Sequence, residues 1–312
     1  MTKHLMVTSS PHLRSARSTR SIMQEVCLAL APAGIAGIVL FGWNALAIMV
    51  TSVLSCVVSE YLFQRITHQK VLIGDWSAVV TGLLLAYNIP ADAPLWIPLI
   101  GGFLAIVLVK QLFGGLGGNF MNPALTARAI LFVSWSSIMS HYPTTRFMTD
   151  ATTSGTPLVQ IAAGESVSVM DLLIGNCGGV LGETCKIAII LGGVYLIVRG
   201  IVDWRIPVTF IGAAFIAYLI QDGFDVALMQ VLSGGLLLGA FFMATDYVTC
   251  PMSGLGRVIY GIGCGVLLFV IRSYASYVEG CSFAILFMNV MTPLIDRFTA
   301  GRLFGEVKKA RG

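Results

Sequence analysis

Long apolar runs dominate the chain, and short segments that carry most of the charged residues separate them. A helix needs about 20 mostly apolar residues to cross a bilayer. We predict ten membrane-spanning helices, at residues 22–41, 45–63, 71–88, 95–113, 122–140, 184–200, 205–221, 226–247, 254–272 and 279–297. Several of these ranges are short for a straight span, which indicates tilted or broken helices. The pattern predicts an all-α polytopic membrane protein.

The positive residues set the predicted orientation, because cytoplasmic loops keep Lys and Arg while translocated loops lose them. With the N-terminus inside, 16 of the 19 Lys and Arg residues lie on the inner side or at adjoining helix ends; Arg146, Lys186 and Arg272 lie outside. We therefore predict an N-in, C-in topology. Residues 1–21 form a cytoplasmic N-terminal segment, residues 298–312 a cytoplasmic tail, and residues 141–183 an external loop.

An internal similarity indicates a repeat. Residues 79–85 (VVTGLLL) resemble residues 231–238 (VLSGGLLL), and residues 120–123 (FMNP) resemble residues 287–289 (FMN). The third predicted span then pairs with the eighth, and the fifth with the tenth. A unit of five helices must insert in opposite orientations, which is the inverted repeat of many transport proteins.

We accordingly divide the membrane part into two inverted five-helix repeats, residues 22–140 and 184–297. Helices of such folds are often broken at glycine near the bilayer midplane, where half-helix ends make polar sites. Gly82 and the Gly234–Gly235 pair mark the expected breaks in the third and eighth spans.

The composition excludes several classes of protein. Only 11% of residues are charged and 56% are hydrophobic, whereas soluble domains carry about 25% charged residues. The net charge of +4 is scattered between apolar runs, so nucleic acid is not an expected partner. Seven cysteines without a C-x-x-C pair indicate neither a disulfide framework nor a zinc site; we assign no metal ligands.

Acidic residues in or near membrane spans are costly and therefore candidates for function. The candidates are Glu60, Asp75, Asp246 and Asp296, all near predicted span ends. Asp246 is the best candidate for contact with a transported cation, and hydrogen bonding at a helix end is the alternative. No string of midplane carboxylates is present in the sequence, so partner subunits are expected to contribute to any ion route.

The external loop contains an unusual segment, TDATTSGTPL at residues 149–158. One acidic residue precedes a group of hydroxyl side chains, and a proline follows the last of them. The segment is turn-prone and expected to be exposed. A hydroxyl there could be an attachment point, or the segment could be a plain polar turn.

This segment resembles the flavinylation motif of the RnfD and NqrB proteins, in which a threonine holds FMN through a phosphoester bond. The matching residues are Asp150, Ser154, Gly155 and Thr156, with Thr156 as the acceptor and Gly155 where the family usually has alanine. Four further segments resemble RnfD in the same order: residues 10–12, 113–124, 242–249 and 279–289. The first span follows only about 21 residues, whereas NqrB-type proteins have a longer extension, so RnfD is favoured.

The resemblance implies a membrane subunit of the bacterial Rnf complex, which relays electrons between ferredoxin and NAD and couples this flow to Na+ or H+ translocation. It implies covalent FMN on Thr156 and no catalytic residue of the chain's own. Riboflavin is an additional option near Gly82 and Gly234–Gly235.

The implied partners are the membrane subunits A and E, the flavoprotein G, the iron–sulfur subunits B and C, a flavin transferase that takes FMN from FAD, and membrane lipid. The implied location is the cytoplasmic (inner) membrane, with the flavin loop on the periplasmic side. Tyr142, Arg146 and Phe147 are candidates for ring or phosphate contact, or for an interface belt.

Two alternatives remain open at this point. One is an NqrB-type subunit of a Na+-translocating NADH:quinone oxidoreductase. The other is an inverted-repeat solute channel or transporter without flavin. Asn122-Pro123-Ala124 resembles the aquaporin pore motif, but the segment related by the repeat reads Asn289-Val290-Met291, which disfavours that type of channel.

Overall fold

The computed structural model describes residues 17–147, 156–162, 167–275 and 280–300. Helices are the only extended regular structure among the described residues, and the only β-type pairing among them is an isolated antiparallel bridge between Pro90 and Val180. The expected all-α architecture is therefore confirmed. Together with the apolar helices it makes the chain a multi-pass membrane protein.

The first half of the chain begins with two long helices that a single residue separates. Its elements are α1 (Thr19–Phe41), α2 (Trp43–Ile66), the 3₁₀ turn η1 (Ile73–Asp75), α3 (Ser77–Tyr87), α4 (Trp96–Phe103), the π-helix η2 (Leu104–Gln111), α5 (Pro123–Ser134) and α6 (Ser136–Met139).

The second half begins with two short helices that precede the next long one. Its elements are α7 (Pro157–Ala162), α8 (Val169–Ile174), α9 (Lys186–Val198), α10 (Arg205–Asp222), α11 (Phe224–Leu232), α12 (Leu236–Leu238), the π-helix η3 (Gly239–Met243), α13 (Gly254–Tyr274) and α14 (Cys281–Thr299).

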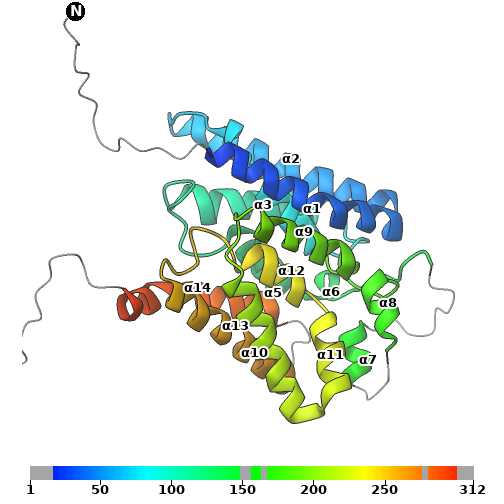
Figure 1. Cartoon of the computed structure of the whole chain (residues 1–312). Coiled ribbons are helices and arrows are strands. Elements are labelled where there is room, and N and C mark those ends of the chain that lie inside the picture. The colour runs from blue at the N-terminus through cyan, green and yellow to red at the C-terminus, as the bar shows by residue number, and fades with distance from the viewer. Residues whose placement is uncertain (1–16, 148–155, 163–166, 276–279, 301–312) are drawn as a thin grey trace, which may run out of the picture.

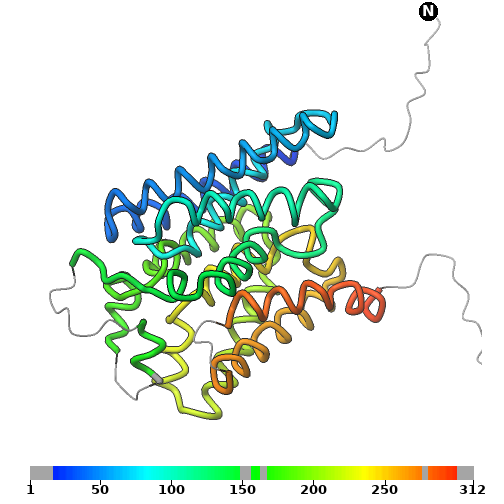
Figure 2. Tube along the Cα trace, turned by 180° about the vertical axis from the view of Figure 1, so that it is seen from behind, coloured from blue at the N-terminus to red at the C-terminus, as the bar shows by residue number. Residues whose placement is uncertain are grey.

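The helices form one bundle. Helices α1 and α2 run side by side along one flank, and α13 and α14 run along the opposite flank, in both views (Figures 1 and 2). Within each half, α2 packs against α3 and α4, and α10 packs against α13 and α11. Contacts between α1 and α9 and between α5 and α14 join the halves. In the predicted repeat α1 corresponds to α9 and α5 corresponds to α14, so each of these contacts joins two helices that the repeat relates.

Each of the ten predicted spans overlaps a helix or a run of helices, but their lengths differ. Only α1, α2, α13 and α14, among the described residues, are long and apolar enough to cross a membrane as single straight helices. The segment from Phe224 to Met243 meets the same criteria as one span with a bend of 65°. The number of spans and the two inverted repeats remain predictions.

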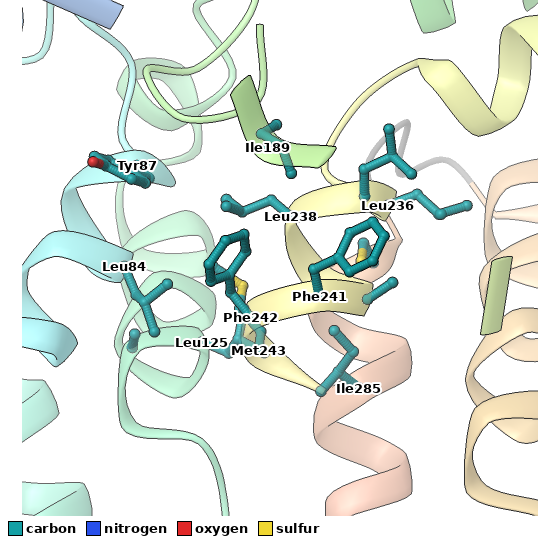
Figure 3. Close-up of a cluster of buried hydrophobic side chains, with 14 of the residues drawn as sticks. Leu84, Tyr87, Leu125, Ile189, Leu236, Leu238, Phe241, Phe242, Met243 and Ile285 are labelled. Carbon is teal, nitrogen blue, oxygen red and sulfur yellow. The ribbon is translucent and has the colours of Figure 1, made fainter. Parts of the chain in front are cut away.

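The centre of the bundle is an apolar cluster built around the short elements α12 and η3. Leu236, Leu238, Phe241 and Phe242 lie in one cluster with Leu84 of α3, Leu125 of α5, Ile189 of α9 and Ile285 of α14 (Figure 3). All of these side chains are buried. The second half thus supplies a broken helix whose side chains contact both halves.

The expected breaks are only half correct. The eighth span is broken at Ser233–Gly235, where Gly234 has φ +62°, a conformation that favours glycine. The third span is continuous through Gly82 and breaks earlier, at Trp76, which has φ +68°. A Cβ at Gly82 would lie 2.7 Å from Val53 Cα. Gly82 is therefore required for close packing of α3 on α2 and does not break the helix.

The two asparagines that the predicted repeat relates, Asn122 and Asn289, occupy different positions in their helices. Asn122 is the N-cap of α5, with Oδ1 accepting from Ala124 N at 3.0 Å, whereas Asn289 lies inside α14 and accepts from Tyr260 Oη at 2.6 Å. Pro123 occupies the first turn of α5, where a missing N–H costs nothing. The short motifs therefore serve different local purposes in the two halves.

Large apolar side chains cover the outside of the bundle. Exposed examples on the long helices are Leu28, Ile35, Trp43, Val208, Ile220 and Val266. Such an extensive apolar surface would be costly in water and is the surface expected against lipid tails. Membrane lipid is therefore the environment that this surface fits.

Replacing Gly82 tests the packing of α3 on α2. We expect Gly82→Ala to destabilise the folded chain by about 1–3 kcal/mol, because the added methyl group overlaps the α2 backbone. Gly212→Ala in α10 is the matched control, since no atom lies within 4 Å of a Cβ there. Thermal unfolding in the same detergent measures both, and an unchanged midpoint for Gly82→Ala would contradict the close approach.

Candidate functional site

The break between α11 and α12 exposes two half-helix ends inside the bundle. The carbonyl groups at the end of α11 lack their next helical turn, and α12 starts with unsatisfied N–H groups. The ends of helices carry partial charges, negative at the C-terminus and positive at the N-terminus. The break therefore requires charged or polar partners on both sides.

Two cations contact the C-terminal end of α11. Lys186 Nζ donates to Gly234 O at 2.7 Å and also to Glu183 O. Arg272 Nη1 donates to Gln230 O at 2.8 Å, and Nη2 donates to Ser233 O at 3.1 Å. Both cations thus donate to backbone carbonyl oxygens at the interrupted end of α11.

A carboxylate lies at the other end of the break. Glu183 is buried, and a side chain at Gly235 would overlap its Oε1 atom, so the carboxylate adjoins the start of α12. Arg128 Nη2 of α5 lies 3.9 Å from Glu183 Oε1, and Arg128 also donates to Ser282 Oγ of α14. We call Arg128, Glu183, Lys186 and Arg272 the outer charge cluster.

The segment that carries Glu183 is buried, although it belongs to the predicted external loop. All residues from Cys177 to Thr184 are buried. Gly182 N donates to Tyr87 O at 3.0 Å, and Leu181 N donates to Ile89 O at 3.4 Å. Tyr87 Oη in turn donates to Leu30 O at 2.8 Å. These bonds hold the segment against the end of α3.

Thr156, the predicted flavin acceptor, lies beside the outer charge cluster. It is 3% exposed, and its Oγ1 has no hydrogen-bond partner among the described residues. It lines a cavity of about 20 Å³ together with Glu183, Thr184, Lys186 and Gly234. Thr184 Oγ1 likewise has no described partner. Burying a hydroxyl without a hydrogen-bond partner costs free energy, so the unpaired Thr156 hydroxyl points to a bound ligand or a chemical function at this position.

The expected exposure of this segment was wrong for its C-terminal end. Thr156, Pro157 and Leu158 are buried, because α7 packs against α11 and Leu158 reaches Gly234. The other motif residues, Asp150, Ser154 and Gly155, lie outside the described residues. Their roles stay predictions.

A second buried polar group lies at the other end of the bundle. Lys110 Nζ of η2 donates to Glu60 Oε1 at 2.8 Å and to Ser77 Oγ at 2.6 Å, and Gln111 Nε2 donates to Glu60 Oε1 at 2.7 Å. Glu60 is only 1% exposed. We call Glu60, Ser77, Lys110 and Gln111 the inner polar cluster.

The π-helices help to place these residues. Leu112 N donates to Val107 O at 3.1 Å, and Ala244 N donates to Gly239 O at 2.8 Å; both bonds have the i to i+5 spacing of a π-turn. In η2 this widened turn lets two consecutive side chains, Lys110 and Gln111, reach one carboxylate. Such turns are frequent at functional sites.

A cavity of about 90 Å³ lies between the halves next to the inner polar cluster, and we call it the larger cavity because it exceeds the one beside Thr156. Its polar lining includes Thr81, Lys110, Asn119, Asn122 and Asp246, and the rest is mostly apolar. Its residues come from α1, α3, η2, α5, α9 and η3 or the turns beside them. It therefore lies beside the third and eighth predicted spans, although not at Gly82 or Gly234–Gly235.

The acidic candidates mostly have local partners. Asp75 Oδ1 accepts from Ser77 N at 2.9 Å, and Asp296 Oδ1 accepts from Met252 N at 3.0 Å. Asp246 accepts from Thr249 Oγ1 at 3.3 Å and also lines the larger cavity. Hydrogen bonds at helix ends and turns account for Asp75 and Asp296. For Asp246, contact with a transported cation and hydrogen bonding at a helix end both remain predictions.

Two of the candidates for contact with the flavin ring or phosphate, Arg146 and Phe147, have different surroundings. The Arg146 guanidinium lies over Gly42, and Arg146 N donates to Leu40 O at 3.0 Å. Phe147 is exposed and lines an outward-facing cavity with Val39 and Asp171. Arg146 thus has a packing role between α1 and α2, and Phe147 remains open to a ligand.

The chain matches one protein family over residues 6–305, the NQR2, RnfD, RnfE family. This match covers nearly the whole sequence. The chain belongs to this family.

Individual members of the family agree with the resemblance to RnfD. The chain is 48% identical to the D subunit of the Na(+)-translocating ferredoxin:NAD(+) oxidoreductase complex of Acetobacterium woodii, over 98% of this chain and 96% of that protein. It is 39% identical to the proton-translocating counterpart of Clostridium ljungdahlii, over 96% of each. It is also 33% identical to the D subunit of an ion-translocating oxidoreductase complex from Halorhodospira halophila, over 97% of this chain and 96% of that protein. The RnfD resemblance is confirmed.

The outer charge cluster was not predicted from the sequence of this family member. The charge pattern of the sequence places Lys186 and Arg272 on the external side and Arg128 on the inner side. The available signal was that each lies in or at the edge of an apolar run, where a cation is costly and functional. Lys110, Arg128 and Lys186 are buried in the bundle, so they carry no information on topology.

The inner polar cluster gives a prediction about buried charge. Lys110→Met leaves the Glu60 carboxylate without its cation, and we expect a loss of about 3–5 kcal/mol in stability. The double variant Glu60→Gln with Lys110→Met removes both charges and is expected to recover most of that loss. Thermal unfolding of the three proteins measures the effect. Equal stability of the single variant and the wild type would show that Lys110 does not neutralise Glu60.

Proposed function

We propose that the chain is the RnfD subunit of an ion-translocating ferredoxin:NAD oxidoreductase (Rnf) complex and carries FMN covalently on Thr156. The protein relays electrons through this flavin between ferredoxin and NAD. Family membership and the names of the relatives support the assignment to the complex. The main structural support for the flavin site is the Thr156 hydroxyl. It is buried beside Lys186 and has no hydrogen-bond partner among the described residues.

The residues around Thr156 fit a phosphoryl linkage. The linkage forms when Thr156 Oγ1 bonds to the phosphorus of the FMN half of FAD, AMP leaves, and the hydroxyl proton is lost. The flavin supplies the redox chemistry, while the chain holds the phosphate and orients the ring. The adjoining cavity of about 20 Å³ accommodates about one water. A flavin ring would therefore have to lie outside this cavity, and loading Thr156 would require the α7 segment to shift.

The assembly and location follow from the same proposal. Partners are the membrane subunits A and E, the flavoprotein G, the iron–sulfur subunits B and C and, for loading, a flavin transferase. The chain resides in the bacterial cytoplasmic membrane with both termini inside and Thr156 on the external side. Electrons from the flavoprotein would arrive at that side.

Asp246 is the proposed contact for the transported cation, since its carboxylate lines the larger cavity. The relatives are named for different ions, Na+ in one case and protons in the other. The coupling ion of this chain therefore does not follow from similarity.

The alternatives are distinguishable. An NqrB-type subunit belongs to the same family but would support NADH:quinone activity. A flavin-free channel is disfavoured by the family membership and would show no covalent fluorescence. Both are decided by assays on the purified chain and its complex.

Flavin attachment is tested by replacing the acceptor. The chain is expressed with the flavin transferase, and ultraviolet fluorescence of the denatured protein on a gel is recorded, followed by mass analysis of the peptide. We expect fluorescence for the wild type and none for Thr156→Ala. Thr184→Ala is the matched control, because it removes the neighbouring unpaired hydroxyl of the same cavity and should keep the flavin. A fluorescent Thr156→Ala protein would refute the assignment.

We also propose that the larger cavity between the halves is where riboflavin binds without a covalent bond. Its apolar walls fit an aromatic ring, and Asn119 and Asn122 offer hydrogen bonds to the ring edge.

Chromatography of flavins released on denaturation tests this proposal. We expect riboflavin from the wild type and much less from Val80→Phe, whose ring would fill the cavity. Val79→Phe, on the same helix but not lining the cavity, should retain it. Absence of riboflavin in the wild type would rule the site out.

A further inference from the structure

A cavity of about 420 Å³ lies where α10 and α13 begin. Arg205 is the first residue of α10, and Arg257 lies in the first turn of α13. Both line this cavity together with Asp203, Trp204 and Tyr247. We call it the basic cavity. One water takes about 30 Å³ in the liquid, so the basic cavity has room for a group much larger than a water.

The two arginines of the basic cavity share one carboxylate. Arg257 Nη1 pairs with Asp203 Oδ2 at 2.6 Å, and Arg257 Nε donates to Pro251 O at 3.1 Å. The backbone N–H of Arg205 donates to Asp203 Oδ1 at 3.0 Å, but the Arg205 guanidinium makes no hydrogen bond or ion pair in the described part of the chain. A guanidinium is a planar fork of five donors that fits a phosphate. Arg205 therefore has donors available for an anion.

The rest of the chain supplies few carboxylates that could take the place of an anion there. The ends of the chain that lie outside the described residues, 1–16 and 301–312, contain six Lys or Arg residues and one acidic residue, Glu306. The described carboxylates on this side have partners of their own, namely Arg199 for Glu25, Met252 N for Asp296 and Thr249 Oγ1 for Asp246.

Apolar stripes lead away from the basic cavity along both helices. Val208 and Ile216 are exposed on α10, and Ile259, Ile262 and Val266 are exposed on α13. Their spacing places each set on one face of its helix. Helices α10 and α13 pack along one another (Figure 1), and both stripes start at the end that holds the arginines. Exposed stripes of this kind fit acyl chains.

The aromatic residues of the basic cavity also fit a membrane interface. Trp204 and Tyr247 are both exposed, and such rings are enriched where the hydrocarbon meets the headgroups. Tyr247 Oη donates to Ile201 O, which holds its ring beside the cavity. A headgroup in the cavity would therefore lie at the level of the interface, with its chains along the apolar stripes.

We propose that the basic cavity binds the phosphate of an anionic phospholipid such as phosphatidylglycerol. Arg205 donates to the phosphate oxygens, Arg257 adds positive charge, and Trp204 packs against the glycerol and the first part of the acyl chains. Basic pockets between membrane helices on the cytoplasmic side bind such headgroups, and the predicted topology places this end of the bundle on that side. The lipid site does not depend on the proposed flavins.

Native mass spectrometry of the chain purified in detergent tests the site. Phosphatidylglycerol is titrated, and phosphatidylcholine with the same acyl chains is the comparison without net charge. We expect the wild type to bind phosphatidylglycerol more tightly. Arg205→Met should raise the dissociation constant of phosphatidylglycerol about fivefold, as for the loss of one basic residue at a membrane surface, and Arg205→Lys should keep part of the affinity. Because Arg205 is in no ion pair, we expect the variant to fold.

Arg65→Met is the matched control. Arg65 is exposed at the end of α2, donates to Tyr61 Oη at 3.2 Å and does not line the basic cavity, so its loss should leave the affinity unchanged. Equal affinities of the wild type and Arg205→Met would overturn the proposal. Glycerol phosphate, which has the phosphate without the acyl chains, should not displace the lipid; displacement at the lipid's own concentration would make this a site for soluble phosphates and overturn the lipid assignment.

A second measurement locates the bound lipid through Trp204. Bromine atoms on acyl chains quench the fluorescence of tryptophans beside them. In proteoliposomes we expect brominated phosphatidylglycerol to quench the wild type more than brominated phosphatidylcholine does, and we expect this difference to disappear in Trp204→Phe. A difference of the same size in both proteins would place the lipid elsewhere and overturn the site. No difference in the wild type would overturn it too, and an acidic segment of a partner protein would then be the occupant to test.

Discussion

The break between α11 and α12 is the constraint on which the outer charge cluster and the segments around it depend. Interrupting a helix inside a bilayer leaves backbone groups that water cannot reach, so the protein must supply their partners. Lys186 and Arg272 meet the carbonyl end, and Glu183 adjoins the amide end. Glu183 and Lys186 come from the segment that leads into α9, and Arg272 comes from the end of α13. Burying the segment from Cys177 to Thr184 follows from the need to bring Glu183 to this point.

The break between α11 and α12 also determines where the central apolar core forms. Because α12 and η3 start at the break, their apolar side chains can face α3 and α5 on one side and α14 on the other (Figure 3). Asn122 then caps α5 and also donates to Met243 O at 3.2 Å, which ties the first half to the end of η3. Polar sites and the apolar core are thus parts of one arrangement around a broken helix.

Periodicity and apolar length were sufficient to predict where the long helices lie, because membrane helices need long apolar runs, but they missed the short helices α7 and α8 inside the predicted external loop. They were insufficient to place the break of the third span, since Gly82 is needed for contact with Val53 and Trp76 adopts the left-handed conformation instead. The motif around Thr156 was recognisable, but its burial was not, because burial results from α7 packing on α11. The outer charge cluster was missed for a similar reason. Arg128 and Arg272 are far in sequence from the neighbouring Glu183 and Lys186, and only the fold brings the three segments together.

The bonds between Tyr87, Ile89 and the buried segment have a mechanical consequence. The segment follows the external loop and leads into the second half, yet its backbone is bonded to the first half through Gly182 and Leu181. Transporters with two related halves work by rocking one half against the other, and this connection opposes such a movement. In the electron relay that we propose for this chain the opposite property is useful, because electron transfer slows steeply as the distance between redox groups grows. The pinned segment would keep that distance constant while ions or partner subunits move around it.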